Sequence, residues 1–174
     1  MKIKKNSVYS FLSFLLIAGF ASCENKGYEE YDVKTTTTIA MDGEWFVDIT
    51  NQASGTTLAQ HVNYRTYDVS VDDDGSMYIE NNLPSTSQYI LRGKIGTDIT
   101  ALTFSSATNE ANIKRLPAGA TFTITEGKIL KNAARSRSGN VVDSIYFKGV
   151  LSNLPGVQLI YSGHKRTGFL EDEY

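Results

Sequence analysis

The sequence predicts an all-β protein, a single antiparallel up-and-down β-barrel of about eight strands. Three observations lead to this prediction. Apolar and polar residues alternate with a period of two, almost no 3.6-residue periodicity is present, and short β-branched and aromatic runs are separated by clusters of Gly, Asn, Asp, Pro and Ser. About eight consecutive strands joined by tight turns are enough to close a small barrel, and closure leaves no exposed sheet edge.

The chain begins with an export signal. Lys2, Lys4 and Lys5 precede an apolar run over residues 8–20, and two small residues follow that run. A basic start, a short apolar segment and small residues before a cut site are typical of a signal peptide. The run is too short to span a bilayer, which takes about 20 apolar residues. We therefore expect residues 1–22 to be a lipoprotein signal peptide.

Cys23 is the only cysteine in the chain. Ala21-Ser22-Cys23 resembles the bacterial lipobox, in which the thiol is diacylated and the new amino terminus is acylated, although Phe20 stands where Leu is usual. We expect lipidation at Cys23 and an exported lipoprotein anchored in the outer membrane, on its periplasmic or cell-surface side. The alternative is an ordinary secretory signal followed by a free cysteine. In either case no intrachain disulfide can form.

Residues 23–39 are polar and include a run of four threonines, so we expect a lipidated flexible tether. The alternative is an extra edge strand built from the threonines. Loss of the three signal lysines leaves 14 basic and 19 acidic side chains, a net charge of −5. This charge makes nucleic acid an improbable partner. Residues 40–174 then form one barrel domain.

The strands of this barrel are expected as follows. A change of parity near Thr66 and Tyr67 predicts a bulge in the second strand, and Glu126-Gly127 predicts a bend in the sixth. Residues 107–119 are the least strand-like part, with room for a helical turn, and residues 132–140 are expected to be a mobile loop. The predicted strands are 44–50, 61–71, 76–81, 88–95, 99–105, 121–130, 141–151 and 157–164.

Gly43-Glu44-Trp45 at the start of the first strand resembles the Gly-x-Trp signature of the lipocalin and calycin barrels. In those folds the tryptophan closes one end of the barrel, and a basic side chain after the last strand packs over it. The resemblance implies that Gly43, Trp45 and Arg166 close the barrel here, with Lys165 as the second candidate for the basic side chain.

Three longer segments resemble the family named "lipid-binding putative hydrolase". They are GKILKNAA at 127–134, DSIYF at 143–147 and SGHKRTGFLEDE at 162–173. The resemblance implies an exported Bacteroides-type lipoprotein with a calycin-like barrel and a lipid-like ligand. Hydrolase activity is implied by the family name alone, and no catalytic residue is carried over.

The interior of an eight-stranded barrel holds side chains or one small ligand. We expect an apolar or lipid-like ligand in the barrel mouth, with tyrosine hydroxyls orienting its polar end. Gly93 and Gly149 either make room for a cavity or mark bends. The candidate ligand-binding residues are Tyr67, Met77, Tyr89, Phe147 and Tyr161. The face shared with Trp45 is expected to carry Val47, Ile49, Met77, Ile79, Tyr89, Leu91, Phe147, Leu159 and Tyr161.

Two other functions stay open. One is a ligand-free interaction subunit of an outer-membrane complex, and the other is a lipid or ester hydrolase that uses His61 or His164 with an acidic partner. The chain has neither a Gly-x-Ser-x-Gly elbow nor a His-Glu-x-x-His motif. We expect no cofactor and no metal site, and we interpret the acidic run 72–74 as a solvated hairpin turn.

Overall fold

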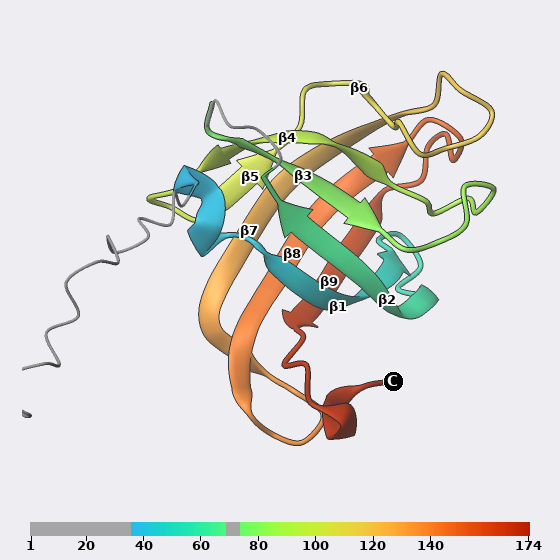
Figure 1. Ribbon diagram of the computed structural model, residues 1–174. Coiled ribbons are helices and arrows are strands. Elements are labelled where there is room, and N and C mark those ends of the chain that lie inside the picture. Colours follow the sequence, from blue (N-terminus) through green and yellow to red (C-terminus); the bar gives the residue numbers. More distant parts are fainter. Residues whose placement is uncertain (1–35, 69–73) are drawn as a thin grey trace, which may run out of the picture. The chain divides into compact units, whose positions relative to one another are not determined.

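The computed structural model describes residues 36–68 and 74–174 of the 174-residue chain, and these form an antiparallel β-barrel (Figure 1). Cys23, the predicted signal peptide and residues 69–73 lie outside the described residues. Two short 3₁₀ helices, η1 (Thr37–Ala40) and η2 (Leu170–Asp172), flank the sheet. The strands are β1 (Gly43–Asn51), β2 (Thr57–Tyr67), β3 (Ser76–Asn81), β4 (Arg92–Asp98), β5 (Thr103–Ser105), β6 (Glu110–Ala111), β7 (Thr121–Arg135), β8 (Val141–Leu151) and β9 (Leu159–Lys165).

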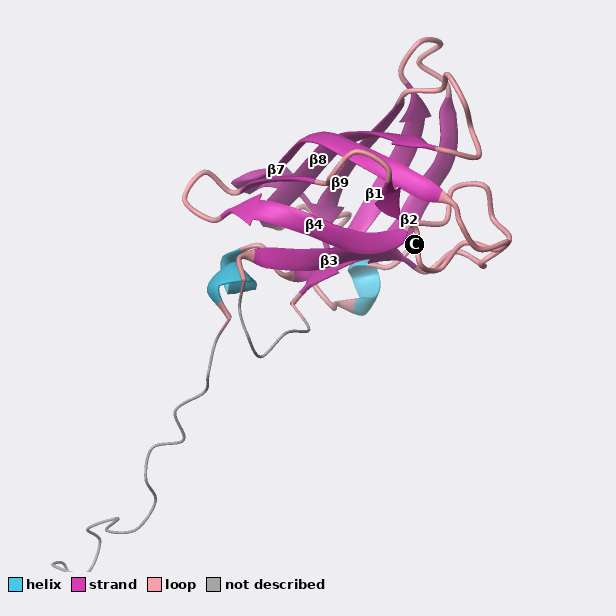
Figure 2. Cartoon of the chain, turned by 90° about the horizontal axis from the view of Figure 1, so that it is seen from above, coloured by secondary structure: helices cyan, strands magenta, loops and turns pink. Residues whose placement is uncertain are grey.

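The sheet closes on itself because β1 pairs with β2 on one side and with β9 on the other, while β5 pairs with β7 (Figure 2). The short strand β6 pairs only with the start of β7 and stands outside this ring. Strands β1 to β5 and β7 to β9 therefore form a closed antiparallel barrel in which neighbours in sequence are neighbours in space. The predicted all-β barrel of about eight strands is confirmed.

The two ends of the barrel are built differently. Trp45 marks the end where β1 begins, β9 ends and the described chain starts, and we call it the Trp45 end. At the opposite end, which we call the distal end, four connections cover the barrel. They are residues 52–56, 82–91, 106–120 and 152–158.

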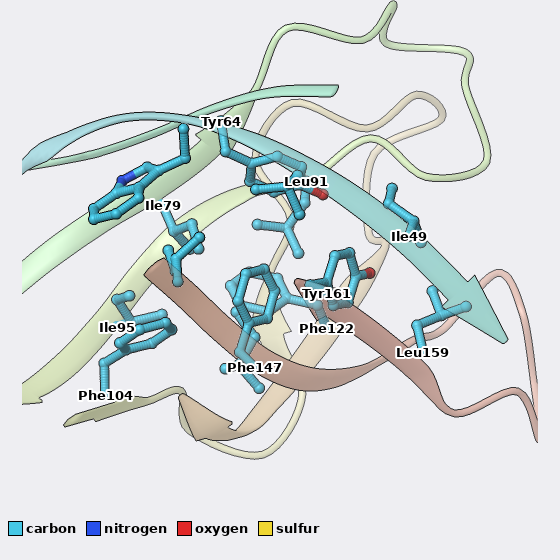
Figure 3. Packing of buried hydrophobic residues seen from close by; sticks show 14 of the residues in the cluster. Ile49, Tyr64, Ile79, Leu91, Ile95, Phe104, Phe122, Phe147, Leu159 and Tyr161 are labelled. Carbon is cyan, nitrogen blue, oxygen red and sulfur yellow. The ribbon is translucent and has the colours of Figure 1, made fainter. Parts of the chain in front are cut away.

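Side chains of alternate residues fill the interior (Figure 3). In β1 the odd-numbered residues from Trp45 to Ile49 point inward and are at most 1% exposed, as the period-two pattern predicts. Tyr89 is only half-buried, because it lies in a connection and not in a strand. The other residues predicted for the interior face are all buried: Val47, Met77, Ile79, Leu91, Phe147, Leu159 and Tyr161.

Strand β2 has its bulge at His61, and the predicted bulge near Thr66 and Tyr67 is wrong. One residue of β1, Asp48, faces two residues of β2, Gln60 and His61, at this point, and His61 has a φ of 50°. The His61 backbone N–H donates to Oδ1 of Asp48 at 2.8 Å. Thr66 and Tyr67 continue regular pairing with β3, in which Tyr67 faces outward. Val69 and Val71, which also suggested the parity change, lie outside the described residues.

Strand β7 contains the bend predicted at Glu126-Gly127. Its pairing with β8 shifts register there, and Glu126 has a φ of 53°. A second register shift surrounds Asn132, where φ is 55°. Beyond it the strand continues to Arg135, so the loop predicted to begin at Asn132 is shortened to residues 136–140. The β7–β8 hairpin therefore extends past the Trp45 end of β9.

Strand β4 starts four residues later than predicted, because the Asn112 side chain forms hydrogen bonds with backbone groups of Ile90 and Arg92. Asn112 donates from Nδ2 to the Ile90 carbonyl at 2.7 Å and accepts from the Arg92 N–H at 3.1 Å. Residues 88–91 therefore belong to the connection that covers the distal end. The predicted helical turn within 107–119 is not formed, since this stretch contains β6 and turns.

Trp45 closes its end of the barrel through a chain of polar contacts. Its indole Nε1 donates to Thr66 Oγ1 at 2.9 Å, and the Thr66 hydroxyl donates to the Met41 carbonyl at 2.7 Å. The side chain over the indole is Lys165, with Nζ 5.7 Å from the ring, and not Arg166. The expectation for Arg166 is corrected because alternation along the end of β9 turns Lys165 inward and Arg166 outward.

Gly43 makes room for this arrangement. A Cβ atom on residue 43 would lie 3.0 Å from Cε of Lys165 and 3.4 Å from the indole of Trp45. Gly43 and Trp45 thus act together, because the absence of a side chain on Gly43 lets the alkyl chain of Lys165 cross the indole ring.

The C-terminal tail covers a second aromatic residue on the outer face. Phe46 points away from the interior but is only 6% exposed. Tyr174 packs edge-on against Phe46, with centroids 5.0 Å apart, and stacks on the His61 ring at 3.6 Å. The Arg166 guanidinium lies 5.4 Å from the Phe46 ring and pairs with Glu44 and Glu173. Arg166 therefore fixes the tail to the start of β1.

Residues 36–39, the last part of the predicted tether, are described and pack on the Trp45 end. Thr38 is fully buried, Met41 is fully buried behind it, and the Lys131 ammonium donates to the Ala40 carbonyl at 2.6 Å. This segment forms η1 and not the alternative edge strand. Among the described residues there is no helix whose length and apolar content would let it cross a membrane.

Gly163→Ala should destabilise the barrel severely, by about 3 kcal/mol or more. A Cβ on residue 163 would lie 2.0 Å from the Phe46 carbonyl oxygen, a backbone atom that cannot move without breaking the β1–β9 ladder. Gly96→Ala is the matched control, because its Cβ would meet its nearest neighbour at 3.9 Å. Urea unfolding of both variants measures the difference, and equal midpoints would contradict this account.

Tyr174→Ala should lower the free energy of unfolding by about 1 to 2 kcal/mol, because it uncovers Phe46 and removes two ring contacts. Leu170→Ala is the control, since Leu170 is 90% exposed and its truncation should change stability by less than about 0.5 kcal/mol. Chemical denaturation of the two variants provides the test. If both truncations have the same effect, the tail does not pack on the barrel in solution.

Candidate functional site

Three tyrosines gather toward the distal end of the interior. Tyr64 on β2 and Tyr161 on β9 are fully buried, and Tyr89 lies in the connection before β4. The rings of Tyr64 and Tyr161 meet edge to face with centroids 6.0 Å apart. The Phe147 ring stacks on Tyr161 at 4.2 Å. In Figure 3 the hydroxyls of Tyr64 and Tyr161 both point toward the side of Ile49 and Leu159.

Asn81 holds this group to the covering segment. Its Nδ2 donates to the Tyr64 hydroxyl oxygen at 2.8 Å and to the Tyr89 carbonyl at 2.9 Å, while its Oδ1 accepts from the Leu83 N–H at 3.3 Å. Both amide protons are thereby used, which fixes the orientation of the amide. The Tyr64 hydroxyl oxygen accepts a hydrogen bond from Asn81, so the hydroxyl can still donate its own proton to another acceptor.

The Tyr161 hydroxyl is buried and has no hydrogen-bond partner within the described residues. Leaving such a group unpaired costs about 1 to 3 kcal/mol. Burial, followed by the nearby Tyr64 and Tyr89, raises the pKa of Tyr161 well above its ordinary value of 10.0. The side chain therefore carries its proton at neutral pH and offers an unused donor.

Burial also controls the titration of Tyr64. Desolvation raises its pKa well above the ordinary value of 10.0, and the hydrogen bond from Asn81 offsets only part of that effect. The site thus contains two neutral phenols in an apolar setting.

The glycines of the barrel wall make room for aromatic rings and not for a cavity. A Cβ on Gly93 would lie 2.3 Å from the Phe122 ring, and one on Gly149 would lie 3.3 Å from the Tyr161 ring. Large side chains therefore occupy the space that the glycines leave. A ligand near Tyr161 must displace part of the distal cover.

Polar links join three parts of that cover, and one of them runs from Asn153 Nδ2 to the Gln88 carbonyl at 2.9 Å. Asn112 connects residues 106–120 to the backbone before β4, and the Leu116 N–H donates to the Ser85 carbonyl at 3.0 Å. Arg115 also donates to the Ser87 carbonyl. A third part, residues 152–158, borders a cleft of about 260 Å³. Its wall includes the buried Phe122 and Leu151.

Two larger hollows lie on the outside of the barrel. One of about 670 Å³ runs over β4, β5 and the bulge of β7, and one of about 570 Å³ runs over the start of β1, the end of β2 and Glu80 of β3. Both are open grooves with charged side chains at their margins, such as Lys128 and Arg65. They offer less enclosure for an apolar ligand than the distal end.

The predicted ligand-binding residues do not all lie together. Phe147 and Tyr161 are stacked, and the Asn81 amide links the Tyr89 carbonyl to Tyr64, whose ring contacts both of them. Met77 is fully buried but starts β3, toward the Trp45 end. Tyr67 faces outward and stacks on Tyr78 at 5.9 Å.

Sequence reasoning missed Tyr64, Asn81 and Asn112 as parts of the site. A signal for Asn81 was present, because it continues the inward series of Met77 and Ile79 in β3. A polar residue at an inward position of a strand needs a partner, and here that partner is a phenol. Asn112 had no such signal, since it follows only a two-residue strand.

Both histidines lie on the outer face at the Trp45 end, against the C-terminal tail. His164 Nε2 is 3.3 Å from the Tyr174 hydroxyl, and His61 stacks on the same ring. Within the described residues, the hydrogen bonds of the two imidazoles include none with a carboxylate. In the part of the chain that the structure describes, no three His, Cys, Asp or Glu side chains are grouped so that they could hold a metal ion.

One protein-family model matches residues 30–170, and its description is "lipid-binding putative hydrolase". The matched region contains every strand of the barrel and both Tyr64 and Tyr161. No curated protein matches the chain.

The stability difference between the wild type and Tyr64→Phe should depend on pH. The raised pKa of Tyr64 makes its contribution to stability fully present below pH 10.0, the ordinary value, and causes its progressive loss as pH rises above that value. Above about pH 10 the wild type should lose up to about 1.4 kcal/mol per pH unit relative to the variant, which has no proton to release.

Urea unfolding from about pH 8 to about pH 12 measures this difference. Ile129→Val changes the core without adding or removing an ionisable group, so its stability difference should stay constant over the same range. A difference for Tyr64→Phe that also stays constant would contradict the role of burial.

Proposed function

Because the chain belongs to the "lipid-binding putative hydrolase" family, we propose that it binds one apolar or lipid-like ligand at the distal end of its barrel. The observation that carries this proposal is the Tyr161 hydroxyl, which is fully buried among aromatic rings and has no partner in the described residues. Such a group gains a hydrogen bond when a ligand supplies the missing partner. Phe147 and Tyr161 would contact the ligand, and Tyr89 would move with the cover.

The ligand would enter by displacement of covering segments and not through an open mouth. The interior is filled by side chains, while the cover is held by individual contacts such as those of Asn112. Connections with few backbone bonds open at a lower free energy than barrel strands do. We propose residues 82–91 as the moving part, because they carry Tyr89 and Leu83 against the core.

We also propose that the protein acts as an exported lipoprotein, anchored in the outer membrane through acylated Cys23. The described chain starts at the Trp45 end, so an anchor at Cys23 would be attached to that end. The distal end would then be free to exchange ligand with a donor or acceptor. Binding is preferred to hydrolysis as the function, because neither imidazole lies beside the tyrosine site.

A second function is favoured by the close packing of the interior. A filled barrel suits a ligand-free interaction subunit of an outer-membrane complex, and the exposed Phe169 and Leu170 on the tail would supply an apolar contact for a protein partner. This alternative predicts no bound small molecule.

Native mass spectrometry of the Cys23→Ser protein, purified without detergent from a lipid-rich host, separates the two functions. Binding predicts an adduct of one small molecule per chain. Tyr89→Ala should then reduce the occupied fraction about tenfold, because Tyr89 is the part of the cover that packs against the core and would close over the ligand. Tyr146→Ala is the control, since Tyr146 faces outward on β8 and lies under Lys128. A wild-type protein without an adduct would favour the interaction subunit.

A further inference from the structure

We infer that the ligand of the distal site is an acyl compound that presents a carbonyl or carboxylate oxygen to the hydroxyls of Tyr161 and Tyr64. This inference rests on the proposed ligand-binding function and specifies the chemistry of the ligand. It follows from counting the donors and acceptors at the site.

The two phenols have two protons to place. Tyr64 accepts from Asn81, and neither Asn81 proton is free because the second goes to the Tyr89 carbonyl. Asn81 Oδ1 is directed to the Leu83 N–H, and the atom that faces the Tyr64 hydroxyl is the donor Nδ2. The Asn81 amide is therefore not the acceptor of the Tyr64 proton. The Tyr161 proton has no acceptor either, since its hydroxyl has no partner in the described residues.

One oxygen with two lone pairs satisfies both protons. The rings lie 6.0 Å apart and their hydroxyls point to the same side of the barrel (Figure 3), so one acceptor between them is compatible with the geometry. A carbonyl or carboxylate oxygen accepts two hydrogen bonds and brings no proton of its own. The site is then fully satisfied.

A ligand that carries a donor fits less well. An alcohol adds a third proton, and with Tyr64 and Tyr161 not bonded to each other one of the three protons stays buried without an acceptor. An ammonium group adds three protons and no acceptor, which costs more. Burial keeps both phenols protonated at neutral pH, so they act as donors there. We expect the order acyl compound, then alcohol, then amine.

The apolar surroundings account for the rest of the ligand. Phe147 stacks on Tyr161, and Ile49, Leu91 and Leu159 lie in the same buried cluster. None of these side chains can bond a polar group. A ligand with a hydrocarbon chain on its carbonyl or carboxylate group therefore matches both the polar and the apolar part of the site.

The test compares four probes that share one C16 chain: palmitate, methyl palmitate, hexadecanol and hexadecylamine. Each displaces a fluorescent fatty acid from the Cys23→Ser protein. We expect palmitate or methyl palmitate to bind about tenfold more tightly than hexadecanol, as one unpaired buried proton predicts. Tighter binding of palmitate would indicate a fatty-acid carboxylate as the ligand group, and tighter binding of methyl palmitate would indicate an ester carbonyl.

Tyr161→Phe should remove that preference. The variant lacks one donor, so acyl affinity should fall about tenfold while hexadecanol affinity changes by less than about twofold. Its melting temperature should equal or exceed that of the wild type, because the change removes only an unpartnered hydroxyl. Tyr146→Phe, on the outer face, should leave all four affinities unchanged.

The outcomes separate the inference from the function on which it rests. Equal binding of acyl probes and hexadecanol by the wild type, or an acyl preference that persists in Tyr161→Phe, would overturn the inference and leave ligand binding intact. If neither the fluorescent fatty acid nor any of the four probes binds the Cys23→Ser protein, the proposed function and the inference are overturned together.

Discussion

The pairing of β1 with both β2 and β9 is the constraint on which the rest of this structure depends. It joins the first strand of the chain to the last and turns an open sheet into a ring. Strand β9 approaches so closely that residue 163 must be glycine, since the Phe46 carbonyl occupies the space of a Cβ. Once the ring is closed, every inward position faces one small interior, and aromatic side chains fill it.

The two ends of the barrel are held by different kinds of interaction. At the Trp45 end, strand termini, η1 and the C-terminal tail are joined by buried contacts, from the Trp45 indole to Thr66 and from Tyr174 to Phe46. At the distal end, connections are joined by side chains such as Asn112 and by backbone bonds such as the one from the Leu116 N–H to the Ser85 carbonyl. Connections open at a lower free energy than paired barrel strands, so the distal end is the place where a ligand could be admitted without loss of the fold.

The tyrosine site combines satisfied and unsatisfied polar groups. Asn81 uses both protons and its carbonyl oxygen, which fixes Tyr64 and the cover in one arrangement. Tyr161 lies beside it with an unpaired hydroxyl, where a phenylalanine would fill the same volume at lower cost. A buried group that lowers stability, as this hydroxyl does, is expected at a functional site. This contrast is the physical basis for assigning the ligand to the distal end.

The sequence by itself determined the fold class and the interior face, because alternation with a period of two fixes which side chains of a strand point inward. It also determined the bend at Glu126-Gly127. Only the tertiary structure decided which basic residue covers Trp45, that the C-terminal tail buries Phe46, and that Gly93 and Gly149 admit rings and not a ligand. These outcomes depend on contacts between residues far apart in the chain, and closure of the ring alone brings such residues together. Only the structure could single out Tyr161 as well. The sequence pattern predicts a buried tyrosine there, but it does not show whether the hydroxyl has a hydrogen-bond partner.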